Sequence, residues 1–549
     1  MGFSILPPTE VGCPIPENTP HAVSVTLPTW EATVAYEEGE DWVVQKMSSG
    51  YPRFFVHSRI QELCAWAEQR YGRPGECAWA FPTFEIAKRC RDFVRARSDH
   101  KKIRIMQLTT PHNDEGVPPV TIVFVFVPVA LKPICKQYWQ HTGEGISSRL
   151  GEFCLEEFSV IPKTDGHVKD YNAFHGSKFE EKVSAKPISE SAEMQTFVEE
   201  RFGRNLDGKF AAEAKEALQK RISSQIKHCS QNDVFLYPTG MTAIFSAHRA
   251  ILEIAGDHKS ICFGFPYVDT LNILRKFGPG VHFLGNGEDV DIDEVERLCK
   301  EEKILALFCE VPSNPLLKTP DLKRLRALAD KYNFAIIVDD TVGNMLNIDV
   351  HDYADVVASS LTKVFSGDSN VMGGCIVLNS KSPWYSKFQE TLEHQYEDTV
   401  WGEDAIYLER NSRDFAERNS HINQNAEAVV ELLEKSPLVK KVFYPKTAPS
   451  KHHYEAIKTE NGGYGGLVSI VLNDEDSAKR FFDTLQTAKG PSLGTNFTLT
   501  CPYAILAHYG ELDFVESFGV DRNLVRISVG LEPKEELIRV FEKALSVCQ

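Results

Sequence analysis

The sequence predicts an α/β protein with a mostly parallel sheet, a smaller C-terminal α/β domain and an N-terminal α+β extension. From about residue 233, short apolar runs alternate with amphipathic segments, which is typical of parallel strands covered by helices. Before residue 190, prolines are frequent and long helical patterns are few. We therefore expect an extension with a polar linker at 1–190, an arm and central domain at 191–410, and a C-terminal domain at 411–549.

The spacing of apolar residues predicts the individual elements. In the extension it predicts strands at 103–108 and 120–127 and helices at 60–71 and 84–97. In the central domain it predicts strands at 260–263, 281–284, 304–309, 335–338, 356–359 and 375–378, and helices at 242–254, 270–277, 292–302 and 322–332. Further on it predicts a long helix from about 406 to 433, a strand at 467–472, and helices at 475–485 and 535–546.

Composition narrows the class of function. The 549 residues include 60 basic and 77 acidic ones, and the net charge of −17 argues against broad binding to nucleic acid or anionic membranes. The 13 cysteines contain no CxxC pair, which favours reduced thiols over a disulfide framework or a zinc site. No basic segment precedes a long apolar core near residue 1, so we expect a cytoplasmic protein that needs no metal.

A lysine and an aspartate give the first indication of chemistry. Lys363, in SSLTK, follows one predicted strand, and Asp339, in VDDT, ends the strand before it. An enzyme that uses pyridoxal 5′-phosphate (PLP) needs a lysine amine for the Schiff base and an acid that keeps the pyridine nitrogen protonated. Taken alone, such a lysine is more often a solvated surface residue and such an aspartate a turn or helix cap. The functional interpretation of the pair therefore depends on the other matching segments.

Three of those segments could hold such a cofactor. Gly240 and Met241 begin a predicted helix, whose free N–H groups suit a phosphate. Tyr267 follows a predicted strand and could stack on an aromatic ring, and Asn314 lies between two prolines at the carboxyl end of another. The alternative explanations are an ordinary helix start, a packed loop tyrosine and a rigid turn.

Taken in order, the segments TGM, YVDT, EVPSNP, VDDT, SLTK, SLG and RISVGLE resemble the PLP-dependent cystathionine γ-synthase family of Cys/Met metabolism. The resemblance covers about residues 195–549 and is strongest to fungal members, which also carry an N-terminal extension. It implies PLP fold type I, which is aspartate-aminotransferase-like. It also implies a homo-oligomer, at least a dimer and by family habit a tetramer.

The resemblance also implies a role for each matching residue. Lys363 would form the Schiff base and move protons, Asp339 would pair with the pyridinium nitrogen, and Tyr267 would stack on the ring. Further cofactor contacts are implied for Gly240, Met241, Asn314, Thr341, Ser360 and Thr362, and substrate contacts for Ser492, Arg526 and Phe497.

One cofactor contact is expected to come from a second subunit. Family members carry an arm with a Tyr-x-Arg motif that reaches the neighbouring subunit's phosphate. Arg204, in RFGR, is the candidate for that arginine, with Phe202 where tyrosine is usual. Further positions depart from the common pattern: Pro238-Thr239 replaces a serine pair, Asp340 an asparagine and Asp368 a histidine. Phe497 stands where bacterial members have a glutamate that recognises an amino-acid partner.

The implied reaction is γ-substitution on an O-activated L-homoserine, most readily the O-acetyl ester, through a vinylglycine ketimine. The default nucleophile is L-cysteine, which gives cystathionine. An alternative keeps the same elimination and admits a carbon nucleophile, such as a β-keto acid or ester. A cystathionine lyase and a non-catalytic assembly protein are the remaining alternatives.

Overall fold

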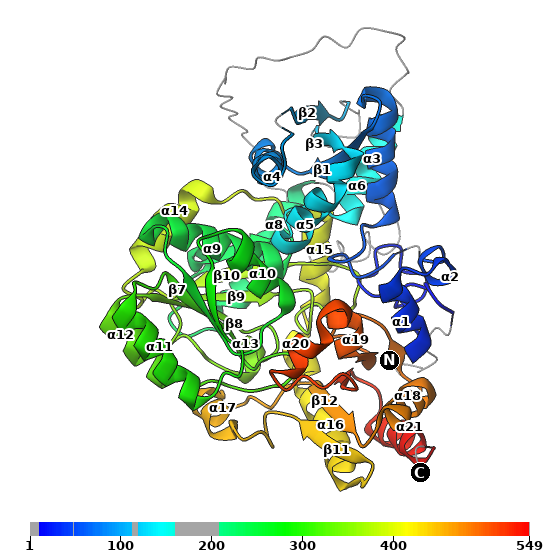
Figure 1. The fold of residues 1–549 in the computed structure, drawn as a ribbon, viewed down its shortest axis with the longest axis vertical. Helices are drawn as coiled ribbons and strands as arrows, with labels where there is room; N and C mark the ends of the chain where they lie inside the picture. The colour runs from blue at the N-terminus through cyan, green and yellow to red at the C-terminus, as the bar shows by residue number, and fades with distance from the viewer. Residues whose placement is uncertain (1–9, 48, 101, 112–118, 160–207, 548–549) are drawn as a thin grey trace.

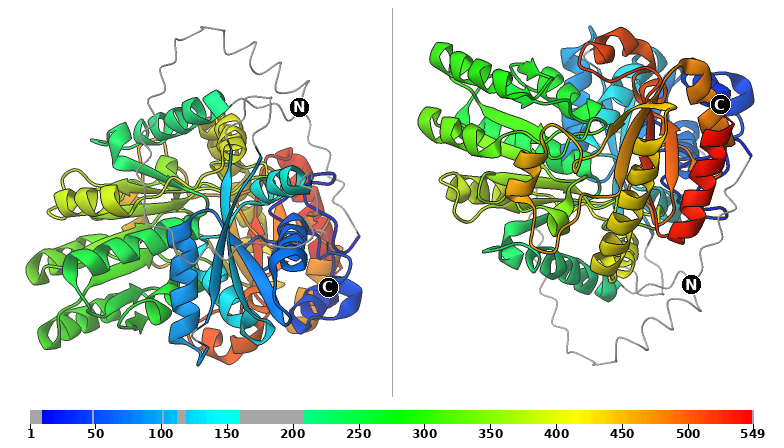
Figure 2. Two further views of the ribbon diagram at one scale, coloured as in Figure 1. Left: turned by 90° about the horizontal axis from the view of Figure 1, so that it is seen from above. Right: turned by 90° about the horizontal axis from the view of Figure 1, so that it is seen from below.

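Three sheets organise the chain in the computed structural model, which describes residues 10–47, 49–100, 102–111, 119–159 and 208–547. Figure 1 shows the N-terminal sheet at the top, the large sheet at the left and the C-terminal sheet at the lower right. Seen from above and below, the helices around the large sheet lie on one side of the molecule and the C-terminal elements on the other (Figure 2).

The N-terminal sheet is antiparallel, in the order β1-β3-β2. The side chains of its central strand, β3, point alternately into two cores. The valines pack with α4 and α5, and Ile122, Phe124 and Phe126 pack with α3 and α6. This α+β arrangement confirms the elements predicted for the extension. The bounds are α3 (Ser58–Tyr71), β1 (Glu76–Phe81), α4 (Phe84–Ala96), β2 (Arg104–Thr109), β3 (Thr121–Pro128), α5 (Lys132–Thr142) and α6 (Ser148–Ser159).

The first part of the extension packs elsewhere. Helices α1 (Trp30–Glu38) and α2 (Asp41–Val44) lie beside the C-terminal elements, to the right in Figure 1. Trp30 is 5% exposed and belongs to the core of the C-terminal sheet. The chain therefore crosses the C-terminal region before it enters the N-terminal sheet, and the connecting residues 49–57 run between the two.

The large sheet has seven strands in the order β4-β10-β9-β8-β7-β5-β6. Strands β5 to β9 run parallel to one another, and β10 pairs antiparallel with both β4 and β9. The mostly parallel sheet confirms the predicted fold class. The bounds are β4 (Val234–Tyr237), β5 (Ser260–Phe263), β6 (Val281–Leu284), β7 (Ala306–Glu310), β8 (Ala335–Asp339), β9 (Val356–Ser360) and β10 (Gly374–Leu378).

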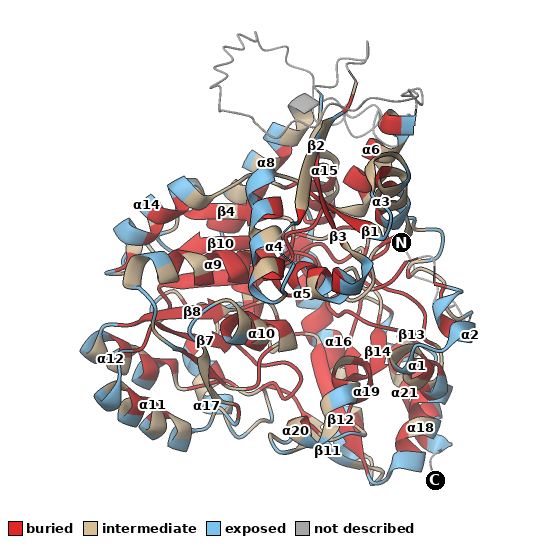
Figure 3. Cartoon of the chain, turned by 45° about the horizontal axis from the view of Figure 1, so that its top comes forward, coloured by how far each residue is buried: buried red, intermediate tan, exposed pale blue. Residues whose placement is uncertain are grey.

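Helices cover both faces of this sheet. The side chains of strand β7 alternate between the two faces of the sheet. Leu307 and Cys309 belong to one core cluster, and Ala306 and Phe308 belong to the other. Figure 3 shows the central strands buried and the outer helix faces exposed. The main helices are α8 (Gly208–Ser223), α9 (Gly240–Ala255), α10 (Val268–Lys276), α11 (Asp289–Glu301), α12 (Leu322–Tyr332) and α14 (Tyr385–Gln395).

The prediction of one long helix from about 406 to 433 is wrong in one respect. The segment forms two helices, α15 (Gly402–Asn411) and α16 (Phe415–Lys435). At the break, Ser412 Oγ donates back to the carbonyl of Leu408 at 2.8 Å and also contacts Arg221 Nη1 at 2.6 Å. A serine that bonds its own backbone competes with the helical ladder, so this contact favours an end there.

The C-terminal sheet has five strands in the order β11-β12-β15-β14-β13. One face packs against α16, α18 and α21, which matches the small α/β domain expected from the sequence. The bounds are β11 (Val439–Phe443), β12 (Leu467–Leu472), α18 (Glu475–Thr484), β13 (Ala488–Lys489), β14 (Leu499–Pro502), β15 (Val525–Ser528) and α21 (Lys534–Ser546). Within the described ranges, no helix is both long enough and apolar enough to cross a bilayer.

Candidate active site

Lys363 lies in the turn after β9, with its amine enclosed by other parts of the chain. The residue is 7% exposed, and Nζ donates to Ser492 Oγ at 3.0 Å and to Tyr51 Oη at 3.1 Å. Gly494 lets its loop approach closely, because a Cβ there would lie 2.8 Å from Lys363 Cβ, and its φ is +70°. The SLTK and SLG segments, far apart in sequence, therefore meet at this amine.

Parallel strands bring two acids to the same edge of the sheet. Glu310 ends β7 and Asp339 ends β8, and the two are paired in register. Burial raises the pKa of Asp339, against the lowering effect of Thr341 hydrogen bonds and the Lys363 charge. Burial and the neighbouring Asp339 raise the pKa of Glu310 well above its usual range. A cation placed against Asp339 would relieve this crowding of carboxyl groups.

An anion cradle forms where α9 begins beside the end of β9. Thr239 caps the helix by accepting the Thr242 N–H at 3.0 Å. The first N–H groups of a helix have no partner within it, so those of Gly240 and Met241 suit an anion. A Cβ on Gly240 would lie 2.7 Å from Ser360 Cβ, so the backbone approach needs a glycine.

Arg526, on β15, closes the opposite end of the site. It is 6% exposed; Nη1 donates to Asn314 Oδ1 at 3.1 Å and Nη2 to the Ser492 carbonyl at 2.6 Å. Its guanidinium carbon lies 4.7 Å from the centre of the Tyr503 ring. A guanidinium fixed in this way presents a planar pair of donors that suits a carboxylate.

Tyr267 lies between these two ends, just before α10. Its N–H donates to Glu310 Oε2 at 2.8 Å. Its hydroxyl is buried and has no hydrogen-bond partner within the described residues. A buried hydroxyl of this kind is stabilised by a ligand that supplies the missing partner.

Most residues proposed from the sequence line one cavity with about 870 Å³ of empty volume. They are Gly240, Met241, Tyr267, Asn314, Asp339, Thr341, Ser360, Thr362, Lys363, Ser492 and Arg526. The cavity lies at the carboxyl ends of parallel strands, where open α/β sheets bind ligands.

The structure does not bring Phe497 to this cavity. Its side chain packs with Ile15, Ala488 and Leu499 in a separate apolar cluster. Ala488 and Leu499 are paired across β13 and β14, which holds the preceding Phe497 beside them. The expectation that Phe497 contacts substrate is therefore not supported. Arg204 lies outside the described residues.

Sequence reasoning missed three cavity residues in the extension, namely Tyr51, Arg53 and Phe54. Their signal was present, since Tyr51-Pro52-Arg53 has the Tyr-x-Arg spacing that was sought near residue 204. The local sequence pattern does not show that these residues line the cavity, or that Tyr51 contacts Lys363, because both depend on long-range packing.

Comparisons with known proteins show the family to which the chain belongs. Residues 175–546 match the family model described as Cys/Met metabolism PLP-dependent enzyme, and residues 59–147 match that of the fungal trans-sulfuration enzyme N-terminal domain. The chain belongs to the Cys/Met metabolism PLP-dependent enzymes. The predicted family and its cofactor are thereby confirmed.

Two relatives of this family are similar over almost their whole length. A cystathionine gamma-synthase of Neurospora crassa is 46% identical over 99% of both chains. A cystathionine gamma-synthase of Saccharomyces cerevisiae is 40% identical over 97% of this chain and 98% of its own. Both therefore extend over the N-terminal region as well as the PLP-binding part.

The fold also matches solved structures of the family. Cystathionine gamma synthase from Xanthomonas oryzae pv. oryzae, crystallised with cystathionine, gives a TM-score of 0.54 at 23% identity. The match covers 63% of this chain and 89% of that one. It confirms fold type I for the part of the chain that it covers.

The residues of the cavity fit the family's cofactor. A phosphate suits the start of α9, where a Cβ on Gly240 would fill the space beside Ser360. A protonated pyridine nitrogen suits Asp339, and the ring of Tyr267 lines the same cavity. Lys363 provides the amine that PLP enzymes require.

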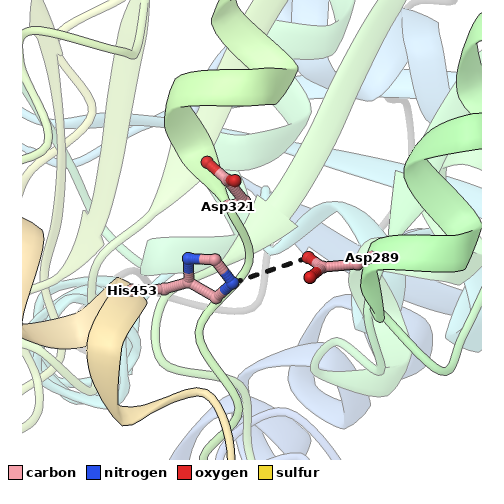
Figure 4. Close-up of side chains that lie close together, drawn as sticks. All are labelled: Asp289, Asp321 and His453. Carbon is pink, nitrogen blue, oxygen red and sulfur yellow. Dashed lines mark ion pairs between the residues drawn. The ribbon is translucent and has the colours of Figure 1, made fainter.

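One group of side chains with metal-binding character lies elsewhere in the described residues. Figure 4 shows Asp289, Asp321 and His453, with His453 Nε2 3.5 Å from Asp289 Oδ1. The Asp289 side chain is 63% exposed, and none of the three lines the cavity. The contact between Asp289 and His453 joins α11 to α17 (Lys451–Ile457), and Asp321 caps α12.

Proposed function

We propose that this chain catalyses γ-substitution on an O-activated L-homoserine, with the O-acetyl ester as the main substrate and L-cysteine as the nucleophile. The observation that carries the proposal is that Ser492 accepts a hydrogen bond from Lys363 at its hydroxyl and one from Arg526 at its carbonyl. A substrate carboxylate bound at Arg526 would place its α-carbon beside the lysine amine. The two fungal γ-synthases that align along nearly the whole chain support the same reaction.

The side chains divide the work of this reaction. Bound PLP supplies an electron sink for the α- and β-carbons of the amino acid. Lys363 Nζ would carry the proton between those carbons, and Asp339 would hold the positive charge of the ring nitrogen. Arg526 and Ser492 would orient the substrate carboxylate. Tyr267 would stack on the ring, with its hydroxyl directed at the leaving group.

The remaining cavity residues would hold the cofactor in place. We propose that Asn314 contacts the ring oxygen, that Thr341 supports the ring, and that the phosphate lies against the start of α9. The phosphate contacts would come from Gly240, Met241, Ser360 and Thr362. Met241, Asn314 and Thr362 are buried, which helps to exclude water that would otherwise consume the activated substrate.

The proposal is tested by incubating the PLP-loaded protein with O-acetyl-, O-succinyl- or O-phosphohomoserine and L-cysteine. We expect cystathionine by mass spectrometry, formed fastest from the O-acetyl ester. If none of the three esters changes the visible spectrum of the bound cofactor, the γ-substitution proposal is wrong. Consumption of cystathionine in the reverse experiment, with no synthesis, would assign the chain as a lyase.

A carbon nucleophile is the second candidate, and the cavity wall favours it. Phe54, Val342, Leu506 and Ala507 give the cavity an apolar side. An enolate of a β-keto acid or ester needs no second ammonium site, whereas cysteine brings an ammonium and a carboxylate. Adding such keto compounds in place of cysteine and seeking a C–C adduct by mass spectrometry distinguishes the two.

We also propose that the chain works as a cytoplasmic homo-oligomer, at least a dimer. The described cysteines form no disulfide, which is consistent with a reducing compartment. Sedimentation velocity gives the oligomeric state, and a fluorescent fusion gives the location. A monomer that is fully active would contradict the first part.

A further inference from the structure

Helix α10, which directly follows Tyr267, is enclosed on two sides. Its apolar face packs into a core of the large sheet through Leu271, Ile273 and Leu274. Its polar face carries Asp269 and Lys276, which are about two helical turns apart. Helix α5 of the N-terminal extension lies beside α10 and covers that polar face (Figure 3).

His141, in the last turn of α5, contacts both ends of α10. Its Nδ1 lies 2.8 Å from Asp269 Oδ1, and its Nε2 lies 2.8 Å from Lys276 Nζ. A lysine ammonium offers only donors, so Nε2 accepts from Lys276 and Nδ1–H donates to Asp269. One imidazole therefore joins the first and last turns of α10 to the extension.

Burial makes this contact specific. Asp269 is 0% exposed and His141 is 5% exposed. A buried carboxylate without a partner is costly, and so is an unpaired ring N–H. Helices α5 and α10 therefore fit together in the one position that places the imidazole against the carboxylate.

A second contact with the extension fixes the far end of α10. Phe277, the residue after the helix, packs against the core of the N-terminal sheet, where its ring is stacked on that of Phe93 at 4.8 Å. Arg97 Nη2 donates to the Lys276 carbonyl at 2.5 Å. The extension thus holds α10 at its start through α5 and at its end through α4.

These contacts bear on Tyr267 because it is the N-cap residue of α10. Its backbone N–H donates to Glu310 Oε2 at the end of β7. The large sheet therefore holds Tyr267 from one side, and the extension holds the helix that begins at Tyr267 from the other. In enzymes, misplacing a group by about 1 Å can cost about 10²-fold in rate.

We propose that His141 is a positioning residue for Tyr267, which it holds through Asp269, Lys276 and helix α10. The N-terminal extension then has a part in catalysis, since it sets the place of the ring that stacks on the cofactor. This role rests on the proposed function for what Tyr267 does. His141 itself touches neither cofactor nor substrate.

The first experiment measures hydrogen exchange of backbone amides by mass spectrometry in the full-length, PLP-loaded protein without substrate. We expect the amides of 268–277 to exchange at least about tenfold faster in His141→Ala than in the wild type, with those of β7 unchanged. His141→Asn should recover part of the protection, because its amide can still donate to Asp269. Both substitutions avoid Asp269, which also contacts Arg53 at 3.4 Å.

Gln137→Ala is the matched control, because Gln137 lies one turn earlier on α5 and is exposed. It should keep the wild-type exchange of α10. Exchange of 268–277 that His141→Ala leaves unchanged would overturn the role of His141 alone. A wild type that turns over none of the homoserine esters would instead overturn the proposed function.

The second experiment is a double-mutant cycle with Tyr267→Ala, measured as turnover of O-acetylhomoserine and L-cysteine at saturating PLP. We expect His141→Ala to lower kcat about tenfold in the presence of Tyr267, with KM within about threefold of the wild type. In the Tyr267→Ala background the same substitution should change kcat by less than about twofold.

The cycle separates positioning from general stabilisation. A contact that only held the extension to the large domain would lower turnover equally in both backgrounds. Additive losses would therefore overturn the proposal even if α10 exchanged faster. Partial recovery of kcat in His141→Asn, in step with its recovered protection, would support it.

Discussion

At the residue scale, Lys363 is held by contacts from two distant segments, the Ser492 hydroxyl and the Tyr51 hydroxyl. Lys363→Ala would remove both the anchor of the cofactor and the proton carrier. We expect turnover to fall by about 10³-fold or more, because general acid–base catalysis alone contributes about 10²–10⁴-fold. The visible absorbance of bound PLP should also disappear.

The control is Lys331→Ala, since that side chain is 58% exposed and pairs with Glu296 on the surface. It should retain both turnover and absorbance. A Lys363→Ala protein with the wild-type spectrum would show that another amine binds the cofactor.

Asp340 is a second residue with a measurable consequence. It is 3% exposed and accepts a hydrogen bond from Ser359 Oγ, and burial raises its pKa from 3.8 to about 7. Between about pH 4 and 7 the folded state holds a proton that the unfolded state has released. The free energy of unfolding therefore falls as the pH rises through this interval, by up to about 1.4 kcal/mol per pH unit.

Asp340→Asn should remove this contribution, because an amide keeps the acceptor for Ser359 and does not ionise. We expect the variant to be more stable than the wild type at pH 8, on the order of 4 kcal/mol, and the difference to vanish near pH 4. Denaturant titrations across a pH series measure it. Two parallel curves for the wild type and the variant would contradict the raised pKa.

At the scale of elements, α16 is joined to the loop of the reactive lysine through Arg418. The residue is 5% exposed, and its guanidinium donates to the carbonyls of Val364, Phe365 and Asn411 at 2.8–2.9 Å. Arg418→Ala would leave these buried acceptors without a donor. We expect about 3 kcal/mol of destabilisation by denaturant titration, with weaker retention of PLP on dialysis.

Arg413→Ala tests whether the effect belongs to this buried network. Arg413 lies at the same helix junction, 47% exposed, and pairs with Glu409. We expect its loss to change stability by less than about 1 kcal/mol. Equal effects of the two substitutions would show that Arg418 has no special structural role.

The elements also show how far sequence reasoning extends. The spacing of apolar residues correctly predicted the parallel strands of the large sheet, because each is a short apolar run between helical patterns. It merged α15 with α16, because their apolar spacing continues while the break comes from the Ser412 contacts. It missed β4, a short strand of four residues at the sheet edge.

The same holds for the candidate site. Residues inside motifs, such as Asp339 and Arg526, were assigned from local sequence and lie together at the cavity. Tyr51 and Arg53 were missed, although their spacing was visible, because their place at the cavity depends on long-range packing: the contact of Tyr51 with Lys363 joins residues 312 apart in the chain. Phe497 was assigned to the substrate site from its position in a motif, but its side chain packs in a separate apolar cluster.

At the scale of the whole molecule, the extension is divided between two parts of the protein. Trp30 enters the C-terminal core, where its ring lies edge-on to Phe482 at 6.3 Å and its backbone N–H donates to Asp483 Oδ1 at 2.8 Å. Tyr51 then reaches the cavity, and the N-terminal sheet follows. Such a path joins the C-terminal region, the active site and the N-terminal sheet through one continuous segment.

We therefore expect the first part of the extension and the C-terminal sheet to unfold as one cooperative unit. Trp30→Ala would leave a cavity in the shared core and should destabilise that unit by about 3–5 kcal/mol. Trp42→Ala is the matched control, because Trp42 is 41% exposed on α2 and should change stability by less than about 1 kcal/mol. Urea titrations followed by far-UV circular dichroism measure both. If Trp30→Ala lost no more stability than Trp42→Ala, or if the helix α1 exchanged its amide hydrogens independently of the C-terminal strands, the extension would be a loosely attached segment instead.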